Sequence, residues 1–363
     1  MLGGDILGKV KSLEEVSKEI GEPIGKTKKF SVENGYYKVT RREKNNIELE
    51  DEKIRTYLSK DNKHVYFKSK RGYNTKYQNK KEYANHYGEY IAYIILKQLG
   101  KKACKVELGS MEMNHPYSRK KIEIDGIVSH LQLAQEEMFW PISSIISMYK
   151  NDHHKQYYEL AERGKTYSDT NHTNIEILLK SIENYYRKNG QEDKIPSARK
   201  DFFDMCIFDI RFANRDRHDD NFGLKFNQLT KEIDYYSLFD NEQILGFQEE
   251  KKDVQRYLES ESAYQKFKDR ELTSYIGIPG NTQKVEPQKL LEYLLEHYYD
   301  EVISSINDIK QYKLEDLKEL MDRCEGLSEE HKKLAETIFE GRRVEFEDTV
   351  RKFEMKKRNS EGR

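Results

Sequence analysis

The chain is poor in cysteine and proline, with three cysteines and six prolines among its 363 residues. Cys104, Cys206 and Cys324 lie far apart, and none belongs to a C-x-x-C pair or to a zinc-like spacing with histidine. The sequence therefore excludes a disulfide scaffold and gives no support to a cysteine zinc site. We expect the thiols to stay reduced and to pack as small apolar side chains.

Long hydrophobic runs are also missing, because no stretch approaches the roughly 20 apolar residues that a bilayer span requires. Residues 1–11 lack the apolar core and the A-x-A cleavage pattern of a signal peptide. We therefore expect a soluble, cytoplasmic protein without a transmembrane segment. Secretion as an effector is not excluded, since delivery by a specialised secretion system requires neither a long hydrophobic run nor a signal peptide of this kind.

An excess of charge of one sign is absent as well, since 64 basic residues face 65 acidic ones and the formal net charge is −1. A protein that binds nucleic acid through its overall field carries a positive excess. The charge balance therefore gives no clear indication that the protein binds nucleic acid. The basic runs at 26–29, 68–81 and 356–358 are local features.

The most informative segment that is present is 209–223, which reads D-I-R-F-A-N-R-D-R-H-D-D-N-F-G. It places Asp216, His218 and Asn221 at short, fixed spacing between two apolar stretches. Phosphoryl transfer uses such a set, because an aspartate orients the acceptor hydroxyl and takes its proton, while an asparagine soon after it binds magnesium. An isolated D-R-H triplet is more often surface charge, but polar residues between two core segments are more often positioned than merely solvated.

A second carboxylate follows downstream. A predicted strand begins at Ile233, and Asp240 comes after it in the string F-D-N-E. This aspartate would complete the metal site that Asn221 begins.

This order of residues resembles the HipA-like serine/threonine kinase family, whose catalytic lobe is similar to that of phosphatidylinositol 3- and 4-kinases. Those lipid kinases share the string D-R-H-x-x-N, which spans residues 216–221 here. Their second metal aspartate is usually followed by Phe-Gly, whereas residues 240–242 read D-N-E, a variation that the HipA-like branch shows. The resemblance implies an α+β, two-lobed protein-kinase-like fold with a β-rich N-lobe and a mostly helical C-lobe.

The resemblance also implies roles for these residues. Asp216 is the expected catalytic base, and His218 is expected to brace the catalytic loop by hydrogen bonding. Asn221 and Asp240 are the expected ligands of Mg2+, which accompanies ATP as the second cofactor.

A kinase further needs a lysine that reaches the α and β phosphates. Residues 64–70 read H-V-Y-F-K-S-K, a run of β-branched and aromatic residues that predicts a strand ending in lysines. Lys68 is therefore the candidate that binds the nucleotide phosphates. Taken alone, it is one basic residue among many at a solvated strand end.

An acid must hold that lysine in place. Residues 82–100 carry apolar side chains at helical spacing and end in Gly100, where a helix cap belongs. The resemblance places Glu89 of this helix opposite Lys68, with Glu82 as the alternative.

The loop that would cover the phosphates has no standard glycine fingerprint. The HipA-like family has a divergent loop at this place, which implies that Gly25, Lys26 and Thr27 contact phosphate through backbone N–H groups. A basic surface turn explains these residues equally well. Further along, Asn34-Gly35 is a strong signal for a β-hairpin.

The predicted organisation has three parts. Residues 1–134 form the β-rich N-lobe, residues 135–355 the helical C-lobe with the catalytic loop and the metal-binding strand, and residues 356–363 a frayed tail. Within the first part we expect a short helix at 49–58 and strands near 106–113 and 122–133. In the second part, helices are predicted at 175–187, 196–212 and 287–309, and two more within 314–353.

The leading expectation is a serine/threonine protein kinase that uses ATP and Mg2+ to transfer a γ-phosphoryl group to a protein hydroxyl and to itself. Its partners would be a protein substrate and, as in the family, an antitoxin or a host protein. One alternative is a phosphoinositide kinase. Another is a non-catalytic HipA-like toxin, effector or nucleotide-binding module, although the presence of Asp216, Asn221 and Asp240 together favours an active enzyme.

Overall fold

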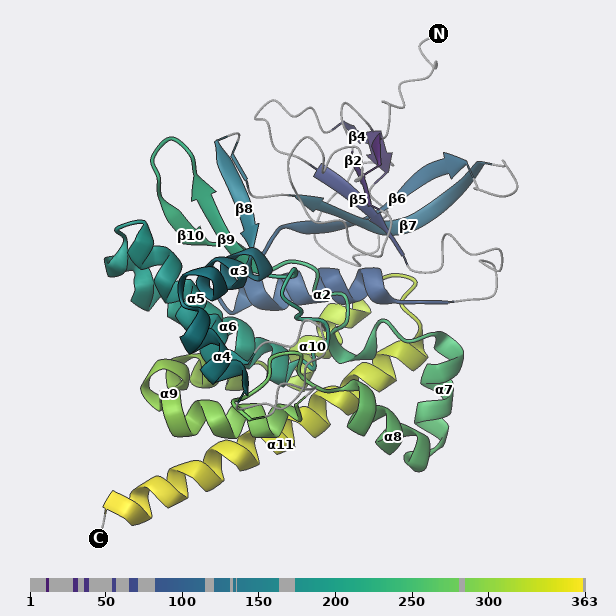
Figure 1. The fold of residues 1–363 in the computed structure, drawn as a ribbon. Helices are drawn as coiled ribbons and strands as arrows, with labels where there is room; N and C mark the ends of the chain where they lie inside the picture. Colours follow the sequence, from purple (N-terminus) through teal and green to yellow (C-terminus); the bar gives the residue numbers. More distant parts are fainter. Residues whose placement is uncertain are drawn as a thin grey trace.

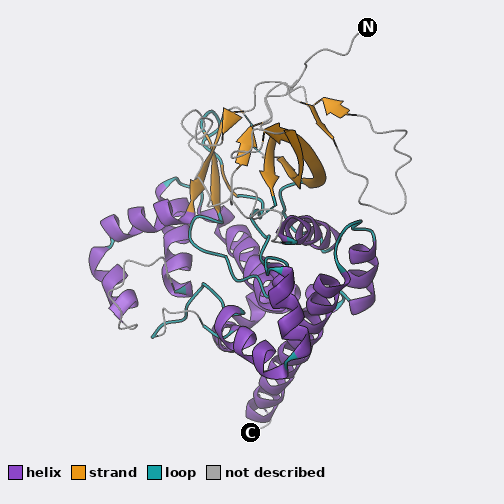
Figure 2. Ribbon diagram, turned by 90° about the vertical axis from the view of Figure 1, so that its right-hand side faces the viewer, coloured by secondary structure: helices purple, strands orange, loops and turns teal. Residues whose placement is uncertain are grey.

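The computed structural model describes the C-terminal part of the chain almost throughout and the N-terminal part in segments. The described residues are 11–12, 29–31, 36–38, 54–56, 65–70, 82–114, 121–130, 133–134, 136–162, 174–280 and 285–361. Figure 1 and the view turned by 90° in Figure 2 both show the strands on one side of the molecule and most of the helices on the other.

Seven strands form one antiparallel sheet in the spatial order β1-β2-β5-β7-β6-β3-β4. Their bounds are β1 Lys11–Ser12, β2 Lys29–Ser31, β3 Tyr36–Lys38, β4 Ile54–Thr56, β5 Val65–Ser69, β6 Val106–Asn114 and β7 Lys121–His130. The predicted strands around Lys68 and at 106–113 and 122–133 are therefore confirmed. Lys68 on β5 lies opposite Ile127 on β7, so the candidate lysine belongs to the middle of the sheet.

The predicted hairpin at Asn34-Gly35 is wrong. Strand β2 pairs with β1 and β5, whereas β3 pairs with β4 and β6 on the other side of the sheet. The turn residues themselves lie outside the described residues. A turn signal describes only a few neighbouring residues, and here the long hairpin of β6 and β7 stands between the two strands that the signal would join.

The predicted short helix at 49–58 is also wrong over residues 54–56, which form strand β4. Strand β4 pairs with β3, from Tyr36 opposite Thr56 to Lys38 opposite Ile54. Ile54 and Thr56 are β-branched, and such side chains favour strands once a neighbouring strand is available.

Helix α2, Asn85–Gln98, lies between the sheet and the other helices (Figure 1). Its residues Ile91, Ala92 and Ile95 are fully buried, which confirms the predicted helical spacing of apolar residues. Gly100 has a φ of +67°, and the N–H groups of Gly100 and Lys101 donate to the last turn of the helix. This is the glycine cap that the sequence predicts.

The remaining helices form the helical body of the protein. Their bounds are α3 Ile142–Asp152, α4 His154–Glu162, α5 Ile175–Lys188, α6 Ile195–Arg211, α7 Lys251–Glu259, α8 Glu261–Glu271, α9 Pro287–Lys310, α10 Leu314–Asp322 and α11 Glu329–Glu361, with short 3-10 turns η2 Glu192–Lys194 and η3 Ile244–Gly246. Helices α5, α6, α9, α10 and α11 confirm the predicted helices. Helix α11 continues to Glu361, so residues 356–361 are helical and do not form the frayed tail that the sequence suggested.

A second sheet of three antiparallel strands was only partly expected. It has the order β10-β9-β8, with bounds β8 Glu137–Pro141, β9 Gly223–Asn227 and β10 Ile233–Tyr235. Strand β10 is the strand predicted to begin at Ile233, whereas β8 falls where the sequence suggested the start of the helical region. None of the helices in the described ranges is long and apolar enough to cross a membrane.

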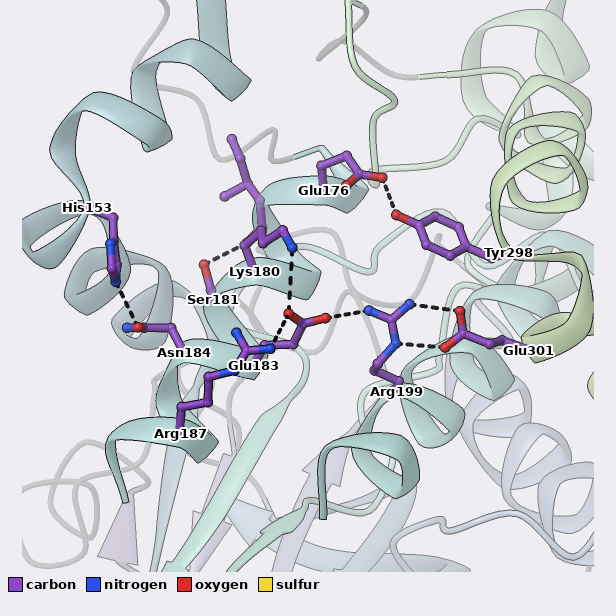
Figure 3. A network of polar contacts seen from close by, with 11 residues as sticks. His153, Glu176, Lys180, Ser181, Glu183, Asn184, Arg187, Arg199, Tyr298 and Glu301 are labelled. Atoms are coloured by element: carbon purple, nitrogen blue, oxygen red, sulfur yellow. Dashed lines mark hydrogen bonds and ion pairs between the residues drawn. The ribbon is translucent and has the colours of Figure 1, made fainter. Parts of the chain in front are cut away.

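A polar network joins helices α5, α6 and α9 (Figure 3). Arg199 of α6 donates to both carboxylate oxygens of Glu301 on α9 at 2.7 and 2.8 Å, and to Glu183 on α5 at 2.5 Å. Tyr298 of α9 donates to Glu176 in the first turn of α5. Because two-point contacts between arginine and carboxylate fix orientation as well as charge, this network sets the position of α6 relative to its neighbours.

Replacing Gly88 of α2 with alanine is expected to destabilise the protein. A Cβ atom there would lie 2.6 Å from the backbone oxygen of Glu242 and 3.0 Å from Cβ of Phe247. Overpacking of this kind costs about 1–3 kcal/mol, more than the ~1 kcal/mol by which alanine is preferred to glycine in a helix. Urea denaturation should show a lower midpoint for Gly88→Ala.

Gly341→Ala in α11 is the matched control. Its new Cβ atom would meet only the hydroxyl of Tyr264, at 3.9 Å. This variant should be as stable as the wild type or more stable by up to about 1 kcal/mol. Equal midpoints for the two variants would contradict the close approach of α2 to residues 242–247.

Candidate active site

Helix α6 leads the chain into the candidate catalytic loop. Its buried side chains Phe202, Phe203 and Phe208 fix the helix in the core, and it ends at Arg211. Ala213 then has a φ of +52°, a left-handed conformation that is uncommon for alanine and turns the chain out of the helix.

A buried guanidinium organises this loop. Arg217 is 2% exposed, and its Nε and Nη2 atoms donate to the two carboxylate oxygens of Asp209 at 2.9 and 3.1 Å. Its Nη1 atom donates to the backbone oxygens of Asn221 at 2.9 Å and Phe239 at 3.1 Å, and Nη2 also donates to the side chain of Asn241. Arg217 therefore joins the end of α6, the candidate catalytic loop and the segment that follows β10.

Both charges of this pair are removed from water. Burial raises the pKa of Asp209, and the neighbouring Arg217 opposes that rise. Burial also acts to lower the pKa of Arg217, but the carboxylate of Asp209 raises it above the ordinary arginine value. Loss of either partner would leave an uncompensated charge in the core.

Two asparagines hold the backbone of the loop. Asn214 donates from Nδ2 to Asp209 at 2.8 Å and accepts a hydrogen bond from the N–H of Asp216 at 3.3 Å. Asn221 donates from Nδ2 to the backbone oxygen of Asp216 at 2.7 Å. Because the amide nitrogen of Asn221 binds the loop itself, its Oδ1 is the atom suited to a cation.

Asp240 has a φ of +55°, which lies in the left-handed region. Such a conformation costs about 1 kcal/mol or more and persists where the surroundings impose it. Arg217 binds the backbone of Phe239 on one side of Asp240 and the side chain of Asn241 on the other. A strained residue that its neighbours hold in place is typical of a functional site.

Lys68 of β5 reaches the same place from the sheet. Its Nζ atom forms an ion pair with Asp240 and lies 3.1 Å from Oε2 of Glu242. Burial acts to lower the pKa of Lys68, but the charges of Asp240, Glu242 and Glu89 together raise it above the ordinary lysine value. The ammonium group therefore stays charged at neutral pH.

Glu242 is a site residue that the sequence reasoning missed. It is 4% exposed, and the oxygen that faces Lys68 also accepts a hydrogen bond from Nδ2 of Asn85, at the start of α2, at 2.8 Å. The sole local signal was a second acid two residues after Asp240. The contacts of the Glu242 carboxylate depend on how α2 packs, and no local sequence pattern reveals that packing.

Asp216 lies in the field of these charged groups. Burial raises its pKa and the carboxylates of Asp240 and Glu242 raise it further, while His218 and Lys68 act in the opposite direction. The net pKa lies above the usual aspartate value. A carboxylate with a raised pKa is a stronger base once it is ionised.

His218 makes local contacts. Its Nδ1 atom accepts a hydrogen bond from the N–H of Asp220 at 3.2 Å, and its own N–H donates to the backbone oxygen of Asp216 at 2.8 Å. Its ring centroid is 6.3 Å from that of Tyr275. These contacts agree with a residue that braces the loop.

The structure thus brings together side chains that the sequence singled out from three separate regions. These are Lys68, Glu89, Asp216, His218, Asn221 and Asp240. Their roles in binding and catalysis stay predictions.

Two further sequence predictions have different outcomes. Gly25, Lys26 and Thr27 lie outside the described residues. Glu82 precedes α2 and pairs with Lys251 at 3.2 Å.

The donor atoms suit Mg2+ that is bound together with phosphate oxygens. Within the described ranges, no three His, Cys, Asp or Glu side chains gather into a protein-only metal site. Mg2+ commonly uses just one or two protein carboxylates, because phosphates and water complete its octahedron. Asp240 and Asn221 offer a carboxylate and an amide oxygen, so the residues fit a metal that arrives with a nucleotide.

The arrangement of sheet, helices and loop defines a kinase-like fold. The Helicobacter pylori proinflammatory kinase CtkA matches over 84% of this chain and 95% of its own, with a TM-score of 0.60 and 17% sequence identity. A chain of the complex of HipA, HipB and operator DNA from the Shewanella oneidensis MR-1 toxin–antitoxin system matches over 95% of this chain and 74% of its own length, with a TM-score of 0.47 and 10% identity.

Sequence comparisons find no similar family or protein. No protein-family model matches the chain, and no curated protein is similar to it in sequence. At 17% identity, the likeness to CtkA shows the fold alone.

Arg217→Met is expected to destabilise the protein strongly, because methionine fills similar space but leaves the buried carboxylate of Asp209 without its charge partner. Removing one partner of a buried ion pair costs about 3–5 kcal/mol. Arg323→Met is the matched control, since Arg323 directly follows α10 and pairs with Glu319 at the surface, where 43% of its side chain is exposed. The control should change the free energy of unfolding by less than ~1 kcal/mol. Similar urea midpoints for the two variants would show that Arg217 does not organise the loop.

Proposed function

We propose that this protein is an ATP- and Mg2+-dependent serine/threonine protein kinase that also phosphorylates itself. The observation that carries this proposal is the ion pair of Lys68 with Asp240 beside the loop of Asp216 and Asn221. A phosphate-binding lysine, two metal ligands and a catalytic aspartate are the parts that kinase phosphoryl transfer needs. The shared fold with CtkA, a kinase, supports the same reading.

Each residue then has a defined task. Lys68 exchanges its contact with Asp240 for the nucleotide phosphates, while the charges of Glu89 and Glu242 hold its ammonium group in place. Asp240 and Asn221 hold Mg2+, which neutralises charge on the phosphates. Asp216 orients the acceptor hydroxyl and accepts its proton.

The loop string D-R-H-x-x-N, similar to that of phosphatidylinositol 3- and 4-kinases, keeps a lipid acceptor as the second candidate. Incubation with radiolabelled ATP in the presence of both phosphoinositide vesicles and protein separates the two. We expect label in protein, on serine or threonine. Label in lipid alone would replace the protein acceptor by a phosphoinositide.

We propose a reducing cytoplasm for this activity, since the thiols of Cys104, Cys206 and Cys324 are buried and far apart in the sequence. An antitoxin or a host protein is the proposed partner, on the family resemblance. If the protein bound ATP without transferring phosphate, the alternative would be a non-catalytic role as a toxin, an effector or a nucleotide-binding module.

Calorimetric titration of ATP, with and without Mg2+, tests the site before any substrate is known. Wild-type protein should bind ATP more tightly with Mg2+, and Asp240→Ala should lose that dependence. Asp216→Asn should bind ATP but incorporate at least about 100-fold less phosphate, since a positioned base contributes that much or more. Asp234→Asn, an exposed carboxylate on β10, is the control and should behave as wild type. Full phosphate transfer by Asp216→Asn or Asp240→Ala would refute the assignment.

The raised pKa of Asp216 predicts the acid side of the pH profile. The base works when ionised, so kcat/KM should fall as the pH drops through the pKa of Asp216, at a pH above the ~3.9 of an ordinary aspartate. Glu242 raises that pKa, so Glu242→Gln should lower it and move the acid limb to lower pH. A limb that stays in place or moves to higher pH would contradict the coupling.

A further inference from the structure

A pocket opens between α7 and α8, the two helices that follow the segment containing Asp240. Its volume is about 510 Å³, within the range of ligand-binding sites. It is lined by Arg256, Tyr257, Ser260, Ser262, Ala263, Lys266, Phe267, Arg270 and Glu271.

The pocket combines an apolar floor with a basic rim. Phe267 is 3% exposed and stacks on Tyr257 with ring centroids 4.4 Å apart. Arg256, Lys266 and Arg270 are exposed cations of the lining. The chemistry therefore suits a ligand that carries negative charge next to an apolar group.

The acid of the lining does not cancel this positive charge. Glu271 lies 3.3 Å from Nη1 of Arg215, so its carboxylate already has a cationic partner. Arg256 is partly balanced by Asp253, at 3.1 Å on the same helix. Lys266 and Arg270 are thus the cations on which recognition would depend most.

One buried side chain, Arg215, connects the pocket lining to the candidate catalytic loop. Arg215 immediately precedes Asp216, and its guanidinium lies 5.7 Å from the ring centroid of Phe267 as well as beside Glu271. The pocket lining and the backbone just before Asp216 are therefore about one arginine side chain apart. An extended peptide of about four residues spans ~13 Å, enough to connect them.

We propose that this pocket binds an acidic segment of the acceptor protein, within a few residues of the serine or threonine that Asp216 addresses. Aspartate or glutamate side chains meet Lys266 and Arg270, and a neighbouring apolar side chain packs on Tyr257, the partly exposed ring of the lining. The inference rests on the proposed kinase function and gives it a substrate class, proteins with acidic sequence beside the acceptor hydroxyl.

A protein segment fits these observations better than a membrane surface. Peripheral membrane binding needs exposed apolar side chains beside the cations. In the described part of the chain the exposed large hydrophobic residues are Met138, Leu229, Val344 and Met355, and none of them belongs to α7 or α8.

The test measures binding without requiring turnover. The probes are a short fluorescent peptide with several glutamates, one phenylalanine and one serine, and its counterpart with lysines in place of the glutamates. Both are titrated by fluorescence anisotropy into full-length Asp216→Asn protein. The acidic peptide should bind and the basic one should not, and binding should weaken as salt screens the charges.

Reversing the charges of the pocket tests whether the acidic peptide binds there. Lys266→Glu combined with Arg270→Glu should weaken binding of the acidic peptide about tenfold or more, because attraction becomes repulsion. Lys252→Glu combined with Arg351→Glu changes the net charge equally at exposed positions outside the pocket lining and should leave affinity unchanged. Calorimetric binding of ATP and Mg2+ should be unchanged in both double variants, which shows that they fold.

The outcomes separate this inference from the function on which it rests. Pocket-dependent peptide binding supports the docking site, even if no phosphate transfer is found and the kinase proposal fails. Phosphorylation that proceeds with no preference for acidic peptides and no effect of the charge reversal overturns the docking site and leaves the kinase proposal intact. Binding of phosphoinositide vesicles that the reversal abolishes, without peptide binding, also overturns it.

Discussion

The pairing of Arg217 with Asp209 is the interaction on which the site depends. A guanidinium offers several N–H donors in a fixed plane, so one side chain can bind a carboxylate at two points and still contact backbone carbonyls. Arg217 uses them to join the end of α6 to the oxygens of Asn221 and Phe239. The candidate catalytic loop and the segment with Asp240 therefore take their positions from one buried ion pair.

Helix α2 supplies the second constraint. Its N-terminal end is tied to the segment after Asp240, through Ala84 N–H to Phe247 oxygen at 3.2 Å and Lys251 N–H to Glu82 oxygen at 2.9 Å. Gly88 allows the helix to touch the backbone at Glu242. The carboxylates around Lys68 thus sit on elements that are packed directly against one another.

The two arginines on either side of Asp216 bind different parts of the protein. Arg217 points its hydrogen bonds into the core, whereas Arg215 pairs with Glu249 and Glu271 toward α7 and α8. Asp216 therefore lies between an arginine bonded into the helical body and an arginine that contacts the lining of a basic pocket. In the proposed kinase, this arrangement connects Asp216 to the surface that we propose selects the substrate.

The sequence by itself determined the features whose cause is local. The spacing of Asp216, His218 and Asn221, the strand of Lys68 and the glycine that ends α2 at Gly100 are written in neighbouring residues. The pairing of β2 and β3 with other strands, strand β8 and the helical end of α11 were not readable, since they depend on which distant partners offer an edge or a face.

Tertiary structure alone decided how the site is assembled. Lys68 and Asp240 are 172 positions apart, and their contact, like the recruitment of Glu242 and the pocket beside Arg215, exists because packed elements bring their backbones together. Local patterns set which residues can do chemistry, because residue type and spacing are properties of a short segment. Only the packing of the core sets which of these residues meet, because the free energy of packing depends on contacts between distant segments of the chain.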